Sequence, residues 1–195
     1  MSDNFSTIIL ASGMSGRMGE PKALLRWDSS FTFLEKIVDV FVRAGSSNIV
    51  CVVNKAAEPY CIGLKLPSCV SIATNNHPEW DRFYSVKTGI QHVKDTDYCF
   101  IHNVDNPFIT PEIVKEIFAS RMPGAWCSPV FEGKGGHPVL LSKTIYSRIT
   151  NKMPDETKLK DFLFPFPRII VETDSDCILR NINTPDDYKR LVAQQ

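Results

Sequence analysis

Three features of the sequence predict a single α/β domain with a three-layer fold, in which a mostly parallel sheet lies between two layers of helices. Strand and helix patterns alternate through roughly the first 120 residues, as in parallel sheets whose strands are joined by helices. Residues 49–53 are uniformly apolar, which is typical of a strand covered on both faces. The 195 residues, without repeats or a linker, have the length of one domain spanning residues 1–195.

The first elements have clear local signals. Residues 7–11 are expected to form a strand that leads into a glycine-rich loop. The helix that follows has recognisable ends, because Thr32 and Glu35 fit a capping box and Gly45 is a natural stop after an apolar stripe. Residues 49–53 then form the second strand.

The middle of the chain is less regular. Residues 70–74 predict a third, weaker strand, and residues 75–84 are polar and aromatic without a regular period. A helix is expected over residues 85–93 with Ser85 as its N-cap. Residues 98–104 form another apolar run of strand length, which ends directly before Asp105.

The last part of the chain begins with a helix opened by Thr110 and Pro111. Strands over residues 125–130 and 137–141 flank the glycine-containing residues 132–136, which predicts a hairpin-like connection. The remaining expected elements are helices over 143–149 and 155–163, a strand over 168–172, and a final helix with Thr184, Pro185 and Asp187 at its capped start.

Composition predicts a small or locally recognised partner. The 22 basic and 22 acidic residues cancel, so no nucleic-acid surface is expected. Neither a secretory signal nor an apolar run of the roughly 18 residues that span a membrane is apparent. The six cysteines lie far apart, several of them in apolar runs, which is typical of buried reduced thiols. These features predict a cytoplasmic protein without a membrane partner.

The clearest functional pattern follows the first strand. Gly13, Gly16 and Gly19 lack side chains, so backbone N–H groups can approach an anion closely and adopt positive φ where it is needed. Arg17 and Lys22 supply two cations suited to a polyphosphate. We expect this loop to bind a nucleotide or another phosphorylated ligand.

Two better-known phosphate-binding loops do not fit this pattern. A P-loop has Ser or Thr directly after its Lys, whereas Lys22 is followed by Ala23. A dinucleotide-binding loop has glycines in the pattern G-x-G-x-x-G, whereas these follow G-x-x-G-x-x-G. An ordinary strand-to-helix turn with two solvated basic residues is the alternative interpretation.

Asp105 is the best candidate for a metal ligand. In parallel sheets ligands bind beyond the carboxyl ends of strands, so Asp105 and the glycine loop should open on one crevice. A carboxylate beside bound phosphates can hold Mg²⁺ with few protein ligands and several waters. The alternative is a turn residue placed before Pro107.

Two further residues have two interpretations each. Asn183 either completes the Mg²⁺ shell through its amide oxygen or, with Asn181, only shapes the turn into the last helix. His137 either contacts a substrate phosphate or is a structural histidine. The other three histidines have no spacing typical of a metal cluster, and no nucleophile–base pair is apparent.

Five segments occur in a collinear order that covers nearly the whole chain. They are LASGMSGRMGEPKALL, PEWDRFYSVKTGI, VDNPFIT, GGHPVLLS and NINTPDDY. Together they resemble the opening loop, the nucleobase and substrate loop, the metal-binding turn, the substrate-side segment and the closing motif of the MobA/MocA-like nucleotidyltransferases, which build molybdenum-cofactor dinucleotides. The opening loop is the most specific of the five.

The resemblance implies a nucleotidyltransferase with a glycosyltransferase-A-like α/β fold. A phosphate of the molybdenum-bearing pterin would attack the α-phosphorus of CTP or GTP, pyrophosphate would leave, and Mg²⁺ would be required. The loop backbone would cradle the triphosphate, while Arg17 neutralises the β- and γ-phosphates and Lys22 the α-phosphate. Asp105 would hold Mg²⁺, with Asn183 as a second ligand.

The resemblance also implies the remaining contacts and partners. The partners would be a nucleoside triphosphate, a phosphorylated small-molecule acceptor and a molybdoenzyme apoprotein. His137 would contact the acceptor. Nucleotide contacts would come from Leu10, Ala11, Ser12, Gly13, Ser15, Gly16, Met18, Gly19 and Ser85.

Two departures from the family pattern leave the base and the acceptor open. Cytidylyl-type relatives generally carry carboxylates where this chain has Asn181 and Asn183, although the opening loop looks closer to that branch, so CTP is favoured over GTP. Phe83 and Tyr84 replace a small, glycine–serine-rich stretch before Ser85. A sugar phosphate or another phosphorylated metabolite is therefore an alternative acceptor, and a non-catalytic cofactor-binding accessory protein is an alternative function.

Overall fold

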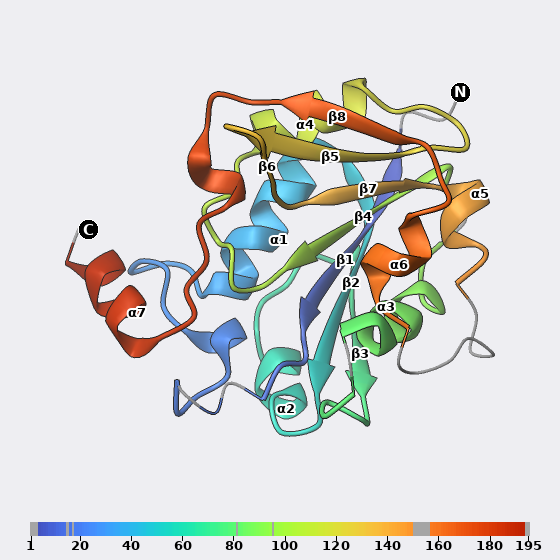
Figure 1. The fold of residues 1–195 in the computed structure, drawn as a ribbon. Coiled ribbons are helices and arrows are strands. Elements are labelled where there is room, and N and C mark those ends of the chain that lie inside the picture. The colour runs from blue at the N-terminus through green and yellow to red at the C-terminus, as the bar shows by residue number, and fades with distance from the viewer. Residues whose placement is uncertain are drawn as a thin grey trace.

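The computed structural model describes residues 4–14, 16, 18–80, 82–94, 96–149 and 157–193. They form one eight-stranded sheet in the order β3-β2-β1-β4-β7-β5-β6, and β8 pairs with β5 (Figure 1). The pairs among β1 to β4 are parallel, whereas β7 runs antiparallel to both β4 and β5. The strands are β1 (Phe5–Ala11), β2 (Ser46–Asn54), β3 (Val70–Asn75), β4 (Tyr98–Asn103), β5 (Trp126–Phe131), β6 (Lys134–Gly135), β7 (Val139–Ser142) and β8 (Arg168–Glu172).

All seven expected strands are confirmed, with ends displaced by at most a few residues. The hairpin-like connection expected over residues 132–136 is present but shorter than predicted, because its turn is Glu132 and Gly133 while Lys134 and Gly135 form the unexpected strand β6, which pairs antiparallel with β5. Both turn residues have positive φ, 48° and 74°. This is the backbone of a type I′ turn, whose twist matches that of the flanking strands.

Helices cover both faces of the sheet, as the apolar strands require. In β1, Ile9 packs in the core that includes α1 and α4, whereas Ile8 and Leu10 pack in the core that includes α3, α5 and α6. In Figure 1, α1 and α3 accordingly lie on opposite sides of β1. The helices are α1 (Phe33–Ala44), α2 (Glu58–Ile62), α3 (Arg82–Ile90), α4 (Pro111–Ala119), α5 (Lys143–Tyr146), α6 (Leu159–Leu163) and α7 (Pro185–Val192), with the 3-10 turns η1 (Lys22–Leu24) and η2 (Asp176–Ile178).

The caps of α1 are those that the sequence predicts. The Thr32 side chain accepts a hydrogen bond from the Glu35 N–H, and the Glu35 carboxylate accepts one from the Thr32 N–H. Gly45 ends the helix with φ 105°, a left-handed conformation that costs glycine little. The Thr110 cap of α4 and the Thr184 capping box of α7 are confirmed as well.

Other helix boundaries differ from the expectation. Ser85 is not an N-cap, because α3 begins three residues earlier at Arg82 and Ser85 lies buried inside it. The helix also ends at Ile90 rather than at residue 93. The helices expected over residues 143–149 and 155–163 are shorter than predicted, since α5 ends at Tyr146 and α6 begins at Leu159. Residues 155–156 lie outside the described residues.

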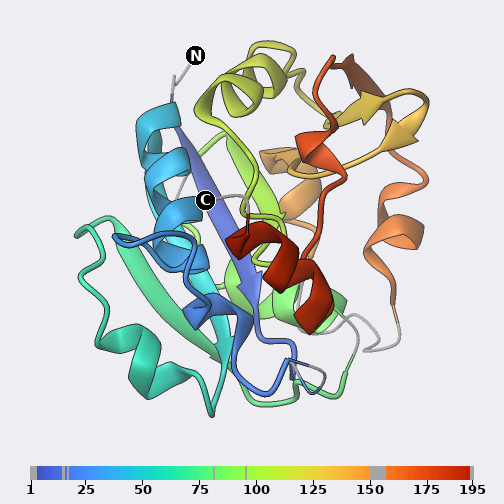
Figure 2. The same cartoon turned by 90° about the vertical axis from the view of Figure 1, so that its left-hand side faces the viewer.

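The C-terminal segment returns to the segment that follows β1. Figure 2 shows α7, in red, facing the viewer beside the blue segment after β1. The Tyr188 hydroxyl donates to the Arg26 carbonyl at 3.1 Å, and the Tyr188 ring packs edge-on against Phe33. Residues far apart in sequence therefore meet at the carboxyl end of β1.

The cysteines are free thiols, and all except Cys69 are buried. Burial raises the pKa of the Cys61 thiol to about 11 and also raises that of Cys51, so both stay protonated near neutral pH. Among the described residues, no helix has the length and apolar character needed to cross a membrane.

Gly136→Ala is expected to destabilise the fold by about 2 kcal/mol or more. A Cβ at Gly136 would lie 2.4 Å from the Ile178 carbonyl oxygen, which also accepts a hydrogen bond from the His137 N–H and cannot easily move. Urea denaturation measures the effect. Gly63→Ala is the matched control, because Gly63 has φ −73° and its Cβ would make only ordinary contacts, so that variant should match or slightly exceed the wild type.

Candidate active site

A cavity of about 290 Å³ lies beyond the carboxyl ends of β1 and β4. These strands are parallel neighbours in which Leu10 pairs with Asn103, so the glycine loop and Asp105 leave the sheet side by side. The expected shared crevice is therefore present. It is lined by Leu10, Ala11, Ser12, Gly13, Gly16, Met18, Lys22, Pro78, Trp80, Arg82, Ser85, Asn103, Val104, Asp105 and Asn183.

Lys22, Asp105 and Asn183 meet at one wall of this cavity. The Lys22 ammonium donates to the Asn183 amide oxygen at 2.9 Å and lies 3.7 Å from an Asp105 carboxylate oxygen. The other Asp105 oxygen, Oδ1, is buried and accepts no hydrogen bond from the described residues. A carboxylate oxygen and an amide oxygen beside one cavity fit a hard divalent cation that keeps several waters or phosphate oxygens as further ligands.

The turn that carries Asp105 is held by several hydrogen bonds, three of which reach its polar groups from His102 and from the segment before α7. The Ile182 N–H donates to the Asp105 carbonyl at 2.8 Å, and the Asn106 side chain donates to the Cys177 carbonyl at 3.0 Å. His102 Nε2 lies 2.9 Å from the Asn106 carbonyl, which can only accept, so Nε2 carries the proton. The first two bonds join the Asp105 turn to the segment that ends at Asn183.

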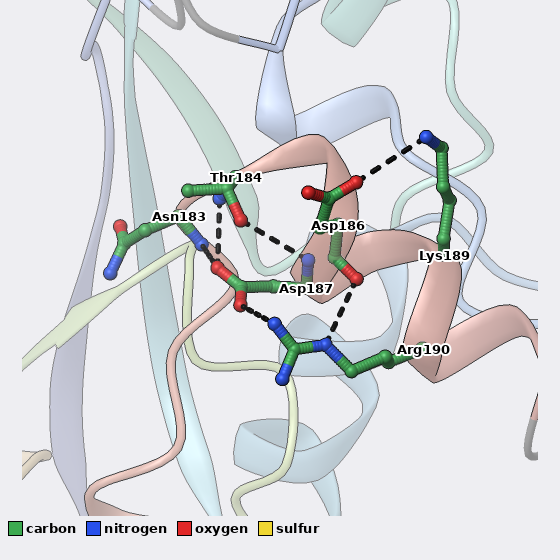
Figure 3. Close-up of polar contacts among 6 residues, drawn as sticks. All are labelled: Asn183, Thr184, Asp186, Asp187, Lys189 and Arg190. Carbon is green, nitrogen blue, oxygen red and sulfur yellow. Dashed lines mark hydrogen bonds and ion pairs between the residues drawn. The ribbon is translucent and has the colours of Figure 1, made fainter.

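Asn183 is placed by the start of α7 (Figure 3). The Asp187 carboxylate accepts hydrogen bonds from the N–H groups of Asn183 and Thr184 at 3.1 and 2.9 Å, and the Thr184 hydroxyl accepts one from the Asp187 N–H. The Thr184 and Asn183 bonds lower the pKa of the Asp187 carboxyl. The capping box thus holds the Asn183 backbone, while its side chain points away from the helix in Figure 3.

The three loop glycines do not all serve the same purpose. Gly19 has φ 77°, whereas Gly13 does not have a positive φ. Among the described residues, no atom lies within 4 Å of the place that a Cβ would take at any of them. Gly13 and Gly16 line the cavity, where the missing side chains leave room for a ligand, whereas Gly19 is not among the described lining residues. Ser15 and Arg17 lie outside the described residues, so their expected phosphate contacts stay predictions.

Ser85 lines the cavity from inside α3 and joins three elements. Its hydroxyl lies 2.7 Å from that of Ser12 and accepts a hydrogen bond from the Asn75 side chain at 2.9 Å. The carboxyl ends of β1 and β3 are thereby tied to the start of α3. Asn75 has no sequence signal beyond its place at a strand end, and sequence reasoning did not select it.

The PEWDRFYSVKTGI segment also lines the cavity, but sequence reasoning did not select its residues Trp80 and Arg82 individually. The Trp80 indole, 39% exposed, stacks on His77 at 3.9 Å between ring centroids and meets Tyr84 edge-on at 4.7 Å. Arg82 is exposed at the first position of α3 and lines the same cavity. The signal was the polar and aromatic stretch without a period, directly after a strand of a parallel sheet.

His137 does not appear among the described lining residues. Its N–H donates to the Ile178 carbonyl at 3.1 Å, and its imidazole is hydrogen-bonded to the backbone of Ile101. Burial, with the positive charge of Arg82, lowers the pKa of His137 to about 4. These contacts are those of a structural histidine, and a substrate contact at this position stays a prediction.

Acid is expected to destabilise the protein through two buried histidines. Burial lowers the pKa of His102 to about 3 and that of His137 to about 4, whereas an unfolded histidine titrates near 6.5. Below about pH 6.5 the unfolded chain therefore binds more protons than the native one, and the free energy of unfolding falls by about 1.4 kcal/mol per pH unit for each histidine.

Urea denaturation at about pH 7.5 and about pH 5.5 measures this slope. His102→Gln keeps a donor for the Asn106 carbonyl but cannot titrate, so this variant should lose roughly half of the slope. An unchanged slope would show that other groups cause the acid sensitivity.

Comparisons with known proteins agree with this geometry. Residues 7–168 match the family model of the MobA-like NTP transferase domain. The chain is 29% identical over 181 residues to a molybdenum cofactor cytidylyltransferase of Escherichia coli K12, covering 93% of this chain and 92% of the relative. It is 25% identical over 203 residues to a probable molybdenum cofactor guanylyltransferase of Natranaerobius thermophilus, covering 97% of this chain and 96% of the relative.

The crystal structure of Rv0371c from Mycobacterium tuberculosis H37Rv superimposes with a TM-score of 0.78 at 22% identity, covering 97% of this chain and 98% of that one. A second structure of Rv0371c is a complex with manganese, with a TM-score of 0.73 at 20% identity, covering 97% of each chain. The fold is that of the glycosyltransferase-A-like nucleotidyltransferases, as the sequence motifs imply. With the family model spanning most of the chain and the lysine, aspartate and glycine loop gathered at one cavity, this protein belongs to the MobA-like NTP transferase family and is a nucleotidyltransferase.

Proposed function

We propose that this nucleotidyltransferase moves a nucleotidyl group from CTP, or from GTP, onto the phosphate of a molybdenum-bearing pterin, with Mg²⁺ as cofactor. An oxygen of the acceptor phosphate forms a bond to the α-phosphorus, the bond from that phosphorus to the β-bridging oxygen breaks, and pyrophosphate leaves. The observation that supports this most is the convergence of Lys22, Asp105 and Asn183 on the cavity beside the glycine loop.

The roles of the chain's own residues follow from their charge and place. Mg²⁺, held by Asp105 and Asn183 together with phosphate oxygens, would neutralise charge on the triphosphate. The Lys22 ammonium lies beside both side chains, so it can neutralise charge that builds on the α-phosphate as the new bond forms. Arg17 is proposed to neutralise the leaving pyrophosphate. These groups act by position and charge rather than by covalent catalysis.

Trp80 and Arg82 support a flat, anionic acceptor. One face of the Trp80 indole stacks on His77, and the part of the side chain that stays exposed at the cavity can contact a heteroaromatic ring. The Arg82 guanidinium at the same cavity can pair with a phosphate. The sugar-phosphate alternative rests on Phe83 and Tyr84. Phe83, however, is fully buried against Phe162, and Tyr84 packs against Trp80. Neither side chain is therefore placed to select a sugar.

The test measures pyrophosphate release with CTP or GTP, Mg²⁺ and each of two acceptors, the molybdenum-bearing pterin and mannose 1-phosphate. We expect release with the pterin and faster turnover with CTP. Turnover only with the sugar phosphate would establish the alternative acceptor. Calorimetric nucleotide binding without pyrophosphate release in the presence of either acceptor would indicate a non-catalytic accessory protein.

We further propose that the reaction takes place in the cytoplasm and that the product passes to a molybdoenzyme apoprotein.

Arg82→Ala is expected to raise KM for the acceptor by about tenfold, because it removes one charge-assisted contact to an anionic group. KM for the nucleotide should change little. Initial rates at varied acceptor and varied nucleotide separate the two constants. Arg43→Ala is the control, because Arg43 is an exposed arginine of α1 paired with Asp39 and is not among the cavity-lining residues.

A further inference from the structure

Asn54, the last residue of β2, is bonded to the first two residues of the glycine loop. Its side-chain amide donates to the carbonyl oxygens of Ser12 and Gly13 at 3.3 and 3.2 Å. Its own amide oxygen accepts a hydrogen bond from the Ala57 N–H at 2.9 Å. Asn54 is 9% exposed and is not among the described residues that line the cavity, whereas Ser12 and Gly13 are.

These two bonds set the direction of the loop's N–H groups. A peptide unit is planar and trans, so its N–H points opposite to its C=O. The carbonyls of Ser12 and Gly13 both point to Asn54, and the N–H groups of Gly13 and Met14 therefore both point away from it. Two successive N–H groups on one side of a turn form a concavity that binds anions.

We propose that Asn54 is a positioning residue of the phosphate-binding loop. By holding two consecutive carbonyls on the side away from the cavity, its side chain turns the N–H groups of Gly13 and Met14 towards the triphosphate. Asn54 itself does not contact the nucleotide. This inference rests on the proposed function, because it assumes that a nucleoside triphosphate occupies the cavity.

Two variants test the donor role. Asn54→Ala removes the whole amide. Asn54→Asp is more specific, because a carboxylate can still accept from the Ala57 N–H but presents an acceptor to the two loop carbonyls. The repulsion between these oxygens should turn the peptide units and misdirect their N–H groups.

Asn48→Ala is the matched control. Asn48 lies on the same strand, at its other end, and is 3% exposed. Its amide oxygen accepts from the Lys94 N–H at 3.0 Å and from the Ser6 hydroxyl at 3.4 Å. The control therefore removes another buried asparagine, far from the loop. Its effect on thermal stability should resemble that of Asn54→Ala.

Calorimetry measures the Kd of MgCTP, MgGTP and inorganic tripolyphosphate, below the melting temperature of each variant. In Asn54→Ala we expect all three Kd values to rise by about tenfold, the loss for misaligned hydrogen bonds to a charged phosphate. Asn54→Asp should lose more affinity than Asn54→Ala, and Asn48→Ala should keep wild-type Kd values. The ratio of the Kd for MgCTP to that for MgGTP should stay constant in every variant.

Three results with the variants would overturn the inference alone. Unchanged tripolyphosphate affinity with an altered ratio of CTP to GTP would assign the Asn54 amide to the base. An equal loss in Asn48→Ala would show a general effect of destabilisation. Wild-type affinities in both Asn54 variants would show that the loop keeps its orientation without the amide. If the wild-type protein binds none of the three compounds, the proposed function fails together with the inference.

Discussion

Asp105→Asn should lower kcat/KM by about 10³-fold, which corresponds to about 4 kcal/mol of lost transition-state stabilisation. The substitution keeps the shape of the side chain but removes the carboxylate that has a buried, unpartnered oxygen at the cavity. A neutral amide binds Mg²⁺ far less well than a carboxylate does. The described residues contain no group of three or more His, Cys, Asp or Glu side chains that could hold a metal ion.

The structural consequences of this substitution should be small, because the bond that anchors the turn runs from the Ile182 N–H to the Asp105 backbone carbonyl. The thermal midpoint should therefore stay near that of the wild type. Pyrophosphate release gives the rate, and Mn²⁺ binding followed by electron paramagnetic resonance gives the metal affinity. Asp186→Asn is the control, since Asp186 is 77% exposed and its carboxylate pairs with the surface Lys189. Full Mn²⁺ affinity in Asp105→Asn would remove Asp105 from the proposed metal site.

Lys22→Ala should lower kcat by about 10²- to 10³-fold, the usual cost of losing one preorganised contact to charge that develops in the transition state. The Lys22 side chain is 15% exposed and lies between Asp105 and Asn183, so its ammonium is fixed before any ligand binds. Because this contact strengthens as the α-phosphate gains charge, kcat should fall more than KM rises.

Steady-state rates at saturating nucleotide and acceptor measure this effect. Lys22→Arg keeps the charge but presents a larger planar group, so it should recover only part of the activity. Lys115→Ala, on the solvent-facing side of α4, is the surface control and should match the wild type. A loss confined to KM would mean that Lys22 binds the nucleotide equally in the ground state and the transition state.

Features that depend on neighbouring residues were predictable from the sequence. The capping boxes at Thr32 and Thr184 and the uniformly apolar centre of β2 all follow from signals within a few residues. The start of α3 was not predictable in the same way. Ser85 looks like a cap, but its hydroxyl is used by Ser12, which lies 73 residues earlier, and the helix starts at Arg82 instead.

The candidate site likewise has one part that the sequence predicts and another that it does not. The strand order of a parallel sheet places the glycine loop beside Asp105, so that pair could be inferred without coordinates. The contact of Lys22 with Asn183 and the amide of Asn54 on the loop carbonyls depend on how distant segments pack. No periodicity or spacing encodes such contacts, and neither Asn54 nor Trp80 was selected from the sequence.

The bond between Lys22 and Asn183 joins residues 161 positions apart. During translation, the pocket wall cannot be completed until the polypeptide through Asn183 has left the ribosome. Given the role proposed for Asn183, we expect a nascent chain that has folded only its first strands to consume no nucleotide until the segment before α7 has docked.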